Sequence, residues 1–179
     1  CKVVYQFRQN DLNNNGQGAP LTPVFHYLVS KIMNNEFDLN YPMNIVNIGG
    51  ITNVSLIKDN KDVEQDLFAY DIAPGNCLID QWLRKNSNKK FDHRGEIAKS
   101  GKVNDLILNQ AKDNFEIISI NESLDINNFD ISFAKGLSFE DGCATLTKFT
   151  AYLIYEGFKK IDKYNKIKTE NFIICGGGR

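Results

Sequence analysis

Two glycine-rich turns, each directly after an apolar run of β type, constrain this chain more than any other feature. The first run, residues 43–48, leads into the letters NIGGITN at residues 47–53, and a further apolar run follows at 52–58. The second, residues 171–175, leads into three consecutive glycines at 176–178. Glycine permits positive φ and lets a ligand approach main-chain N–H groups closely. Because such turns commonly hold phosphates, the pair predicts a nucleotide bound between two loops.

The size and charge of the chain fit a globular domain without general affinity for polyanions. It has 179 residues, of which 42% are hydrophobic and 24% charged, and its formal net charge is −1. We therefore expect no nucleic-acid or membrane partner on electrostatic grounds. No apolar run approaches the ~18 residues that span a bilayer. The four cysteines lack the spacing of a metal site or a disulfide framework, which favours reduced, buried thiols in a cytoplasmic protein.

The order of apolar runs and turn signals predicts an α/β layer with mixed strands. We expect a short strand over 1–7, a helix over 23–33, a hairpin of 43–48 with 52–58, a polar turn over 59–62, a strand over 67–71 and a helix over 78–83. Short helices over 96–100 and 103–111, irregular chain over 113–137, a long helix over 139–163 and a strand over 171–175 complete the prediction. Three antiparallel strands followed by crossover helices are typical of a ribonuclease-H-like domain.

A carboxylate stands at the end of the third predicted strand. Asp71 begins the letters DIAPGN, residues 71–76, directly before a predicted helix. Magnesium prefers oxygen ligands and keeps several of its waters, so this carboxylate could hold a magnesium-bound water. Alternatively, it could stabilise the exposed N–H groups of the helix start. The residues alone leave both interpretations open.

Each of the other motifs also has a structural interpretation. The 47–53 turn could be a plain hairpin, and the glycines at 176–178 could be a flexible end rather than a surface for adenine or ribose. The letters GQGAPL at 16–21 could be a connecting loop rather than a turn that places Gln17 on a sugar. His26, on a predicted helix, is more naturally a packing residue, since its spacing from His93 does not suit a metal. The chain shows no Ser/His/Asp or Cys/His signature.

Taken in order, these motifs resemble the anhydro-N-acetylmuramic acid kinase family, within the sugar kinase, Hsp70 and actin superfamily. The matching segments cover nearly the whole chain and are residues 7–8 with 16–21 and 23–26, 47–53, 71–76 with 80, 92–101, 140–147 and 175–179. The resemblance implies a ribonuclease-H-like (actin-like ATPase) lobe with a mixed sheet and flanking helices. The first phosphate loop of the family is absent, and both ends look cut. We therefore expect the carboxy-terminal part of such a protein, with an inter-lobe and substrate-cleft segment over 1–42 and an ATP-binding lobe over 43–179.

The resemblance also implies an activity and a set of site residues. The family uses MgATP and water to open the ring of 1,6-anhydro-N-acetylmuramic acid and to phosphorylate O6, in peptidoglycan recycling. Asp71 and Gly75 would lie near the metal and the phosphates, with no direct protein ligand assigned to the metal, and Gln17 and Gly18 would face the amino sugar. The complete protein would be a homodimer. The implied phosphate-binding residues are Gly49, Gly50, Ile51, Thr52 and Asn53, and the implied adenosine-binding residues are Gly176, Gly177 and Gly178.

One position departs from the family pattern in a way that bears on catalysis. The family reads Asp-Phe-Arg, and its aspartate is the base that activates water, whereas this chain reads Gln6-Phe7-Arg8. An amide does not accept a proton as a carboxylate does, and a positioned general base contributes ~10²–10⁴-fold to the rate. Asp11 is near in sequence, but no pattern makes it a substitute. The alternative function is therefore a degenerate or split lobe that binds sugar, nucleotide or a partner lobe without catalysis. A kinase for a different sugar is a weaker alternative, because the GQGAPL segment argues against it.

Overall fold

The computed structural model describes residues 1–16, 18–115 and 123–179. Its centre is a four-stranded sheet of order β3-β2-β1-β4, in which β1 pairs antiparallel with β2, β2 antiparallel with β3, and β4 parallel with β1. The predicted α/β layer with mixed strands is confirmed. The third strand continues past residue 71, because its pairing with β2 runs on to Pro74 beyond a register shift at Thr52/Asn53. The strands are β1 (Met43–Ile48), β2 (Ile51–Ile57), β3 (Leu67–Pro74) and β4 (Asn171–Cys175).

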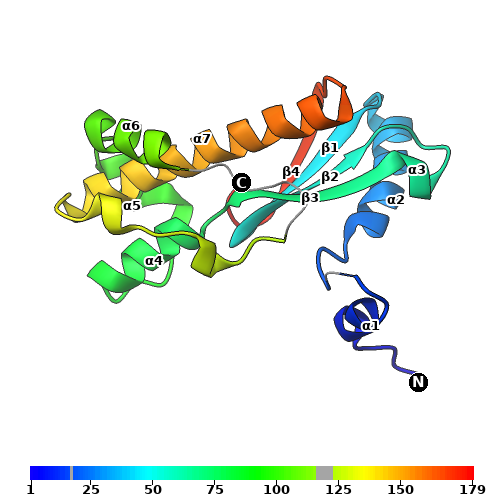
Figure 1. Cartoon of the computed structure of the whole chain (residues 1–179), viewed down its shortest axis with the longest axis horizontal. Coiled ribbons are helices and arrows are strands. Elements are labelled where there is room, and N and C mark those ends of the chain that lie inside the picture. The colour runs from blue at the N-terminus through cyan, green and yellow to red at the C-terminus, as the bar shows by residue number, and fades with distance from the viewer. Residues whose placement is uncertain (17, 116–122) are drawn as a thin grey trace.

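Helices flank the sheet on both faces (Figure 1). The long helix α7 runs along one face, and α2 packs on the other. The strand predicted over 1–7 is wrong: residues 1–6 have no regular structure, and Phe7 begins a helix that lies apart from the sheet (Figure 1). None of the described helices is long and apolar enough to cross a membrane. The helices are α1 (Phe7–Asn13), α2 (Pro23–Phe37), α3 (Val63–Asp66), α4 (Cys77–Asn86), α5 (Glu96–Ser100), α6 (Asp105–Asn114) and α7 (Phe139–Asn165), with 3-10 turns at His93–Gly95, Ile126–Asn128 and Ser132–Ala134.

Alternation along the strands creates two separate cores. Met43 and Ile45 face α2, where Tyr27 belongs to the same buried cluster. Val46 and Val54 belong to the larger cluster on the other face, to which α4, α6 and α7 also contribute. Because successive side chains of a strand point to opposite faces, the apolar residues of β1 fix both cores at once. The sheet is thereby packed between two layers of helices. A binding site can therefore form only at the edges and ends of the sheet.

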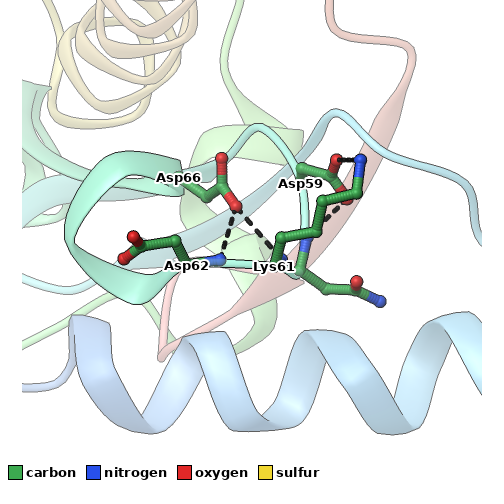
Figure 2. Close-up of polar contacts among 5 residues, drawn as sticks. Asp59, Lys61, Asp62 and Asp66 are labelled. Atoms are coloured by element: carbon green, nitrogen blue, oxygen red, sulfur yellow. Dashed lines mark hydrogen bonds and ion pairs between the residues drawn. The ribbon is translucent and has the colours of Figure 1, made fainter.

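Carboxylates close the connection between β2 and β3 (Figure 2). One oxygen of Asp66 accepts hydrogen bonds from the N–H groups of Lys61 and Asp62, at 3.1 and 2.9 Å, and the Lys61 ammonium pairs with Asp59 at 2.7 Å. Asp62 in turn caps α3 by accepting from the N–H of Glu64 at 2.8 Å. The predicted polar turn is confirmed. It fixes β2 against β3, so that the start of β2 and the end of β3 meet at the opposite end of the sheet.

Candidate functional site

Three turns that are far apart in the sequence meet at one end of the sheet: residues 48–51, 75–77 and 176–178. We call them the glycine cluster. Because β1 and β4 are parallel, their carboxyl ends share this edge, and β2 begins and β3 ends there. The N–H of Gly178 donates to the carbonyl oxygen of Ile48 at 3.0 Å. The turn after β4 is therefore fastened to the end of β1.

The second turn of the glycine cluster is joined to the first by three main-chain hydrogen bonds. The Asn76 N–H donates to the Gly49 carbonyl oxygen at 2.7 Å. The N–H groups of Gly75 and Cys77 both donate to the Gly50 carbonyl oxygen, at 2.9 and 3.2 Å. The carbonyl groups of the hairpin thus face the start of α4. This arrangement makes the hairpin and the helix start one rigid unit.

The glycines of the cluster serve different purposes. A Cβ on Gly75 would overlap the carbonyl oxygen of Gly49, so the fold itself requires glycine there. Gly176 has φ +92°, a conformation that favours glycine. Gly50 has neither constraint: its φ is not positive, and a Cβ would meet nothing within 4 Å among the described residues. Gly50 therefore presents open backbone to the outside of the cluster.

Three of the predicted phosphate-binding residues, Gly49, Thr52 and Asn53, have defined structural partners. Thr52 is fully buried, and its hydroxyl donates to the carbonyl oxygen of Pro74 at 3.2 Å. Asn53 pairs across the strands with Asp71. Gly49 directs its N–H to the carbonyl oxygen of Ile51 at 3.2 Å. The Thr52 hydroxyl is therefore engaged within the sheet, and the open part of this turn is centred on Gly50.

Asn76 joins the cluster, although sequence reasoning assigned it no role. It stands at the N-cap of α4, yet its side chain makes no cap hydrogen bond. The side chain lies instead beside the third turn, because a Cβ on Gly177 would be 3.7 Å from Nδ2 and one on Gly178 would be 2.8 Å from Oδ1. The signal in the sequence is a cap-type residue after Pro74 and a glycine. Asn76 thus links the second and third turns.

The N-terminus of α4 gives the glycine cluster a positive end of a helix dipole, which favours anions. Asp80 lies in the first turn of this helix. Burial raises the pKa of Asp80, and the Arg84 guanidinium, 3.4 Å from its carboxylate, acts in the opposite direction. An anion at the cluster would lie closer to the main-chain dipoles at the start of α4 than to the carboxylate of Asp80, which comes later in the first turn.

Asp71 does not point its hydrogen bonds at the helix start. The described partner of its carboxylate is the main-chain N–H of Leu124, at 2.9 Å from Oδ2. Burial raises the pKa of Asp71, and the hydrogen bond from Leu124 partly opposes this. Of the two roles that the sequence left open, the stabilisation of helix N–H groups gains no support from this contact.

The remaining predicted site residues lie near α1, apart from the glycine cluster. Gln6 directly precedes α1 with φ +62° and lines an open hollow of about 400 Å³. Gly18 has φ +74°; its N–H donates to the Asp11 carboxylate at 2.7 Å, and its carbonyl oxygen accepts from Arg8 Nε at 3.0 Å. Gln17 lies outside the described residues. The Asp11 carboxylate is thus hydrogen-bonded to Gly18, and this bond would have to break before Asp11 could serve as a base.

His26 is a packing residue, as predicted. It is buried, and its Nδ1 lies 2.7 Å from the Ser55 hydroxyl. Burial lowers the pKa of His26. Within the part of the chain that the structure describes, no group of three or more His, Cys, Asp or Glu side chains could hold a metal ion. All four cysteines are free, but only Cys77 and Cys143 are buried, because Cys1 is exposed and Cys175 partly so.

Comparison with known proteins gives a match along the whole chain. The family model described as anhydro-N-acetylmuramic acid kinase matches residues 1–179. The anhydro-N-acetylmuramic acid kinase of Pelagibacter ubique is 45% identical over 99% of this chain and 46% of its own length. Those of Methylobacterium nodulans and Agrobacterium fabrum are each 37% identical, over 98% and 99% of this chain and 44% and 45% of their own lengths. The chain therefore spans a little under half the length of these curated relatives.

Proposed function

Because the chain belongs to the anhydro-N-acetylmuramic acid kinase family, we propose that it forms the ATP-binding lobe of a kinase for 1,6-anhydro-N-acetylmuramic acid. The observation that carries the proposal is the open backbone of Gly50 inside a cluster of three glycine turns at a helix N-terminus. The sheet order, with three antiparallel strands and β4 added in parallel, supports a ribonuclease-H-like lobe.

In the proposed reaction, water attacks the anomeric carbon of the sugar and the bond from this carbon to O6 breaks. O6 takes the γ-phosphoryl group of ATP, which leaves as ADP, and the proton of the attacking water passes to a general base. The product is N-acetylmuramic acid 6-phosphate. Charge develops on the transferred phosphoryl group, so positioning and main-chain dipoles supply most of what the protein contributes.

We assign the nucleotide to the glycine cluster. The phosphates would lie against the turn that runs from Gly49 to Asn53 and against the start of α4, with Gly50 at the closest approach. The adenosine would lie against residues 176–178, and residues 1–42 would supply the substrate cleft, with Gln17 and Gly18 toward the amino sugar. From the family alone, we extend the proposal to a homodimer of the complete protein.

A magnesium ion that arrives with ATP fits this site as a phosphate-bound ion. Asp80, in the first turn of α4, is the carboxylate nearest in sequence to the second turn, whereas the Asp71 carboxylate already accepts the main-chain N–H of Leu124. Magnesium needs few protein ligands, because phosphate oxygens and waters complete its octahedron. When bound, it would neutralise charge on the phosphates, while the chain supplies the dipole of α4 and the open backbone at Gly50.

The test of the nucleotide site is Gly50→Val in the complete protein that contains these residues. A Cβ at this position meets nothing in the described structure, so the variant should fold and melt as the wild type does. The branched side chain would stand where phosphates approach, and we expect ATP affinity to fall about tenfold or more. Asn88→Val, in the exposed loop after α4, is the control and should bind ATP normally. Unchanged affinity in a folded Gly50→Val protein would overturn the assignment.

A second candidate function, binding without catalysis, is favoured by the residue that precedes α1. Gln6 stands where the family pattern has its base, and the nearby Asp11 carboxylate is engaged by the N–H of Gly18. If this candidate is correct, Gln6→Asp should raise sugar phosphorylation by ~10²–10⁴-fold. If the natural protein already turns over as fast as the Gln6→Asp variant, the base assignment and this candidate both fail.

A further inference from the structure

We propose that Asp71 is a positioning residue, which holds residues 18 and 19 of the sugar-facing turn through the main chain of Leu124 and the side chain of Ser123. The inference rests on the proposed function, because only that function makes the turn sugar-facing. It differs from the role that the family resemblance suggests for Asp71, which is at the metal and the phosphates. Two hydrogen bonds carry it, and both lie within the described residues.

The first hydrogen bond joins the sheet to the segment after α6. Asp71 lies on the edge strand β3, opposite Asn53, and its Oδ2 accepts the N–H of Leu124 at 2.9 Å. A half-buried carboxylate is costly unless it is hydrogen-bonded, and hydrogen bonds to a charged acceptor are stronger than those between neutral groups. The Asp71–Leu124 contact therefore fixes one point of residues 123–125, which have no regular structure.

The second hydrogen bond joins that segment to the turn. The hydroxyl of Ser123, the neighbour of Leu124, donates to the carbonyl oxygen of Ala19 at 3.3 Å. Ala19 follows Gly18, whose N–H and carbonyl are held by Asp11 and Arg8. A continuous path of contacts thus runs from β3 through residues 123–124 to the turn. Asp71 is also paired across the strands with Asn53 of β2, and β2 begins at the glycine cluster.

The positioning role and a metal role make different demands on Asp71. Accepting the Leu124 N–H needs one oxygen lone pair, which an asparagine amide also offers. Binding magnesium or its waters needs the negative charge, which asparagine lacks. The variants Asp71→Asn and Asp71→Ala therefore separate the two roles, because only the second removes the acceptor, whereas both remove the charge.

The first measurement is amide hydrogen exchange in the complete protein. We expect Asp71→Ala to speed exchange at the N–H of Leu124 about tenfold or more, with a smaller increase at the N–H of Gly18, and Asp71→Asn to restore both. Ser123→Ala should speed exchange at Gly18 and leave Leu124 protected. If Leu124 keeps its protection in Asp71→Ala, the proposal is overturned.

The second measurement is the split between the two substrates. Asp71→Ala should raise KM for the anhydro sugar several-fold and leave KM for ATP and the magnesium dependence unchanged, with rescue by Asp71→Asn. A change confined to ATP or magnesium in both variants would overturn the proposal in favour of the metal role. If the wild type phosphorylates no anhydro sugar, the proposed function fails, and the exchange data still decide whether Asp71 holds the turn.

Discussion

The main-chain N–H of Gly178 lies 3.0 Å from the carbonyl oxygen of Ile48, so the turn after the last strand is hydrogen-bonded to the end of the first. The third turn of the glycine cluster is therefore part of the fold and not a flexible end. Because β4 pairs in parallel with β1, the cluster requires the crossover through α7 that brings the two strands together. The candidate nucleotide site thus depends on contacts between distant parts of the chain.

Gly75→Ala should destabilise the protein strongly. A Cβ there overlaps the carbonyl oxygen of Gly49, and backbone does not move aside as a side-chain tip does. We expect a loss of about 3 kcal/mol in the free energy of unfolding, measured by chemical denaturation. The matched control is Gly50→Ala, which meets no atom within 4 Å and should remain within about 0.5 kcal/mol of the wild type. Equal stability of the two variants would show that the hairpin and the α4 start are not a rigid unit.

The elements of the sheet could be predicted from the sequence because their signals are local. Apolar runs of β type joined by Gly49-Gly50 mark residues 43–48 and 52–58, and the polar letters between Lys58 and Val63 mark the turn. The prediction of a short strand over 1–7 was wrong because it rested on the same local signal as the correct ones. An apolar run reports that a strand is possible, but a strand forms only where another strand offers hydrogen bonds. No sequence pattern near Val3 reports whether such a partner exists.

The glycine cluster was predicted as a set of motifs, whereas the partners of its side chains were not. Two glycine turns after two strands indicate a shared site once the strands are known to be parallel. The contact of Asp71 with Leu124 has no sequence signal, because the segment around Leu124 has no periodicity. The contact of Asp11 with Gly18 is local, but a carboxylate that folds over a glycine turn looks in sequence like any other acidic residue.

Asn44→Leu should stabilise the protein. Asn44 lies on the central strand β1 with no exposed surface, and neither atom of its amide has a hydrogen-bond partner among the described residues. A buried, unpaired amide costs about 1–3 kcal/mol, and leucine has a similar shape. We expect an increase of about 1–2 kcal/mol in the free energy of unfolding. Asn88→Leu, in an exposed loop, should have little effect, and lower stability of Asn44→Leu would indicate that the amide has a partner such as a water.

Stability should fall as the pH drops below about 6.5 because of His26. Burial lowers the pKa of His26 in the folded state, so the unfolded chain binds the proton first as the pH falls. The free energy of unfolding therefore decreases from the unfolded pKa down to the folded pKa. Each unit of lowering contributes about 1.4 kcal/mol. His26→Gln should remove this slope from denaturation curves between pH 7.5 and 5. The exposed His93 supplies the control, His93→Gln, which should retain it; a slope that survives in His26→Gln would refute the assignment.

The four thiols should divide into classes that report on the fold. Burial raises the pKa of Cys77 to about 11, and burial together with the nearby Asp92 raises the pKa of Cys143 to about 12. At pH 8 the reactive thiolate of either is then at most about 10⁻³ of the total. Cys1 is exposed and Cys175 partly so, so a thiol reagent should show a fast phase that Cys1→Ser removes and a slower phase from Cys175. Cys77 and Cys143 should react only on unfolding.

The same two thiols give stability a dependence on alkaline pH. Their folded pKa values lie above those of the unfolded chain, so the unfolded state releases protons first as the pH rises above about 9. Stability should therefore fall from pH 9 toward the folded pKa values, and Cys143→Ala should lessen the slope.

Cys77 is also a reporter of the candidate site, because its N–H donates to the Gly50 carbonyl. We expect Cys77 to stay unreactive in the native protein. If Cys77 reacts as fast as Cys1, the start of α4 separates from the hairpin, and the conclusion that the glycine cluster is rigid is wrong.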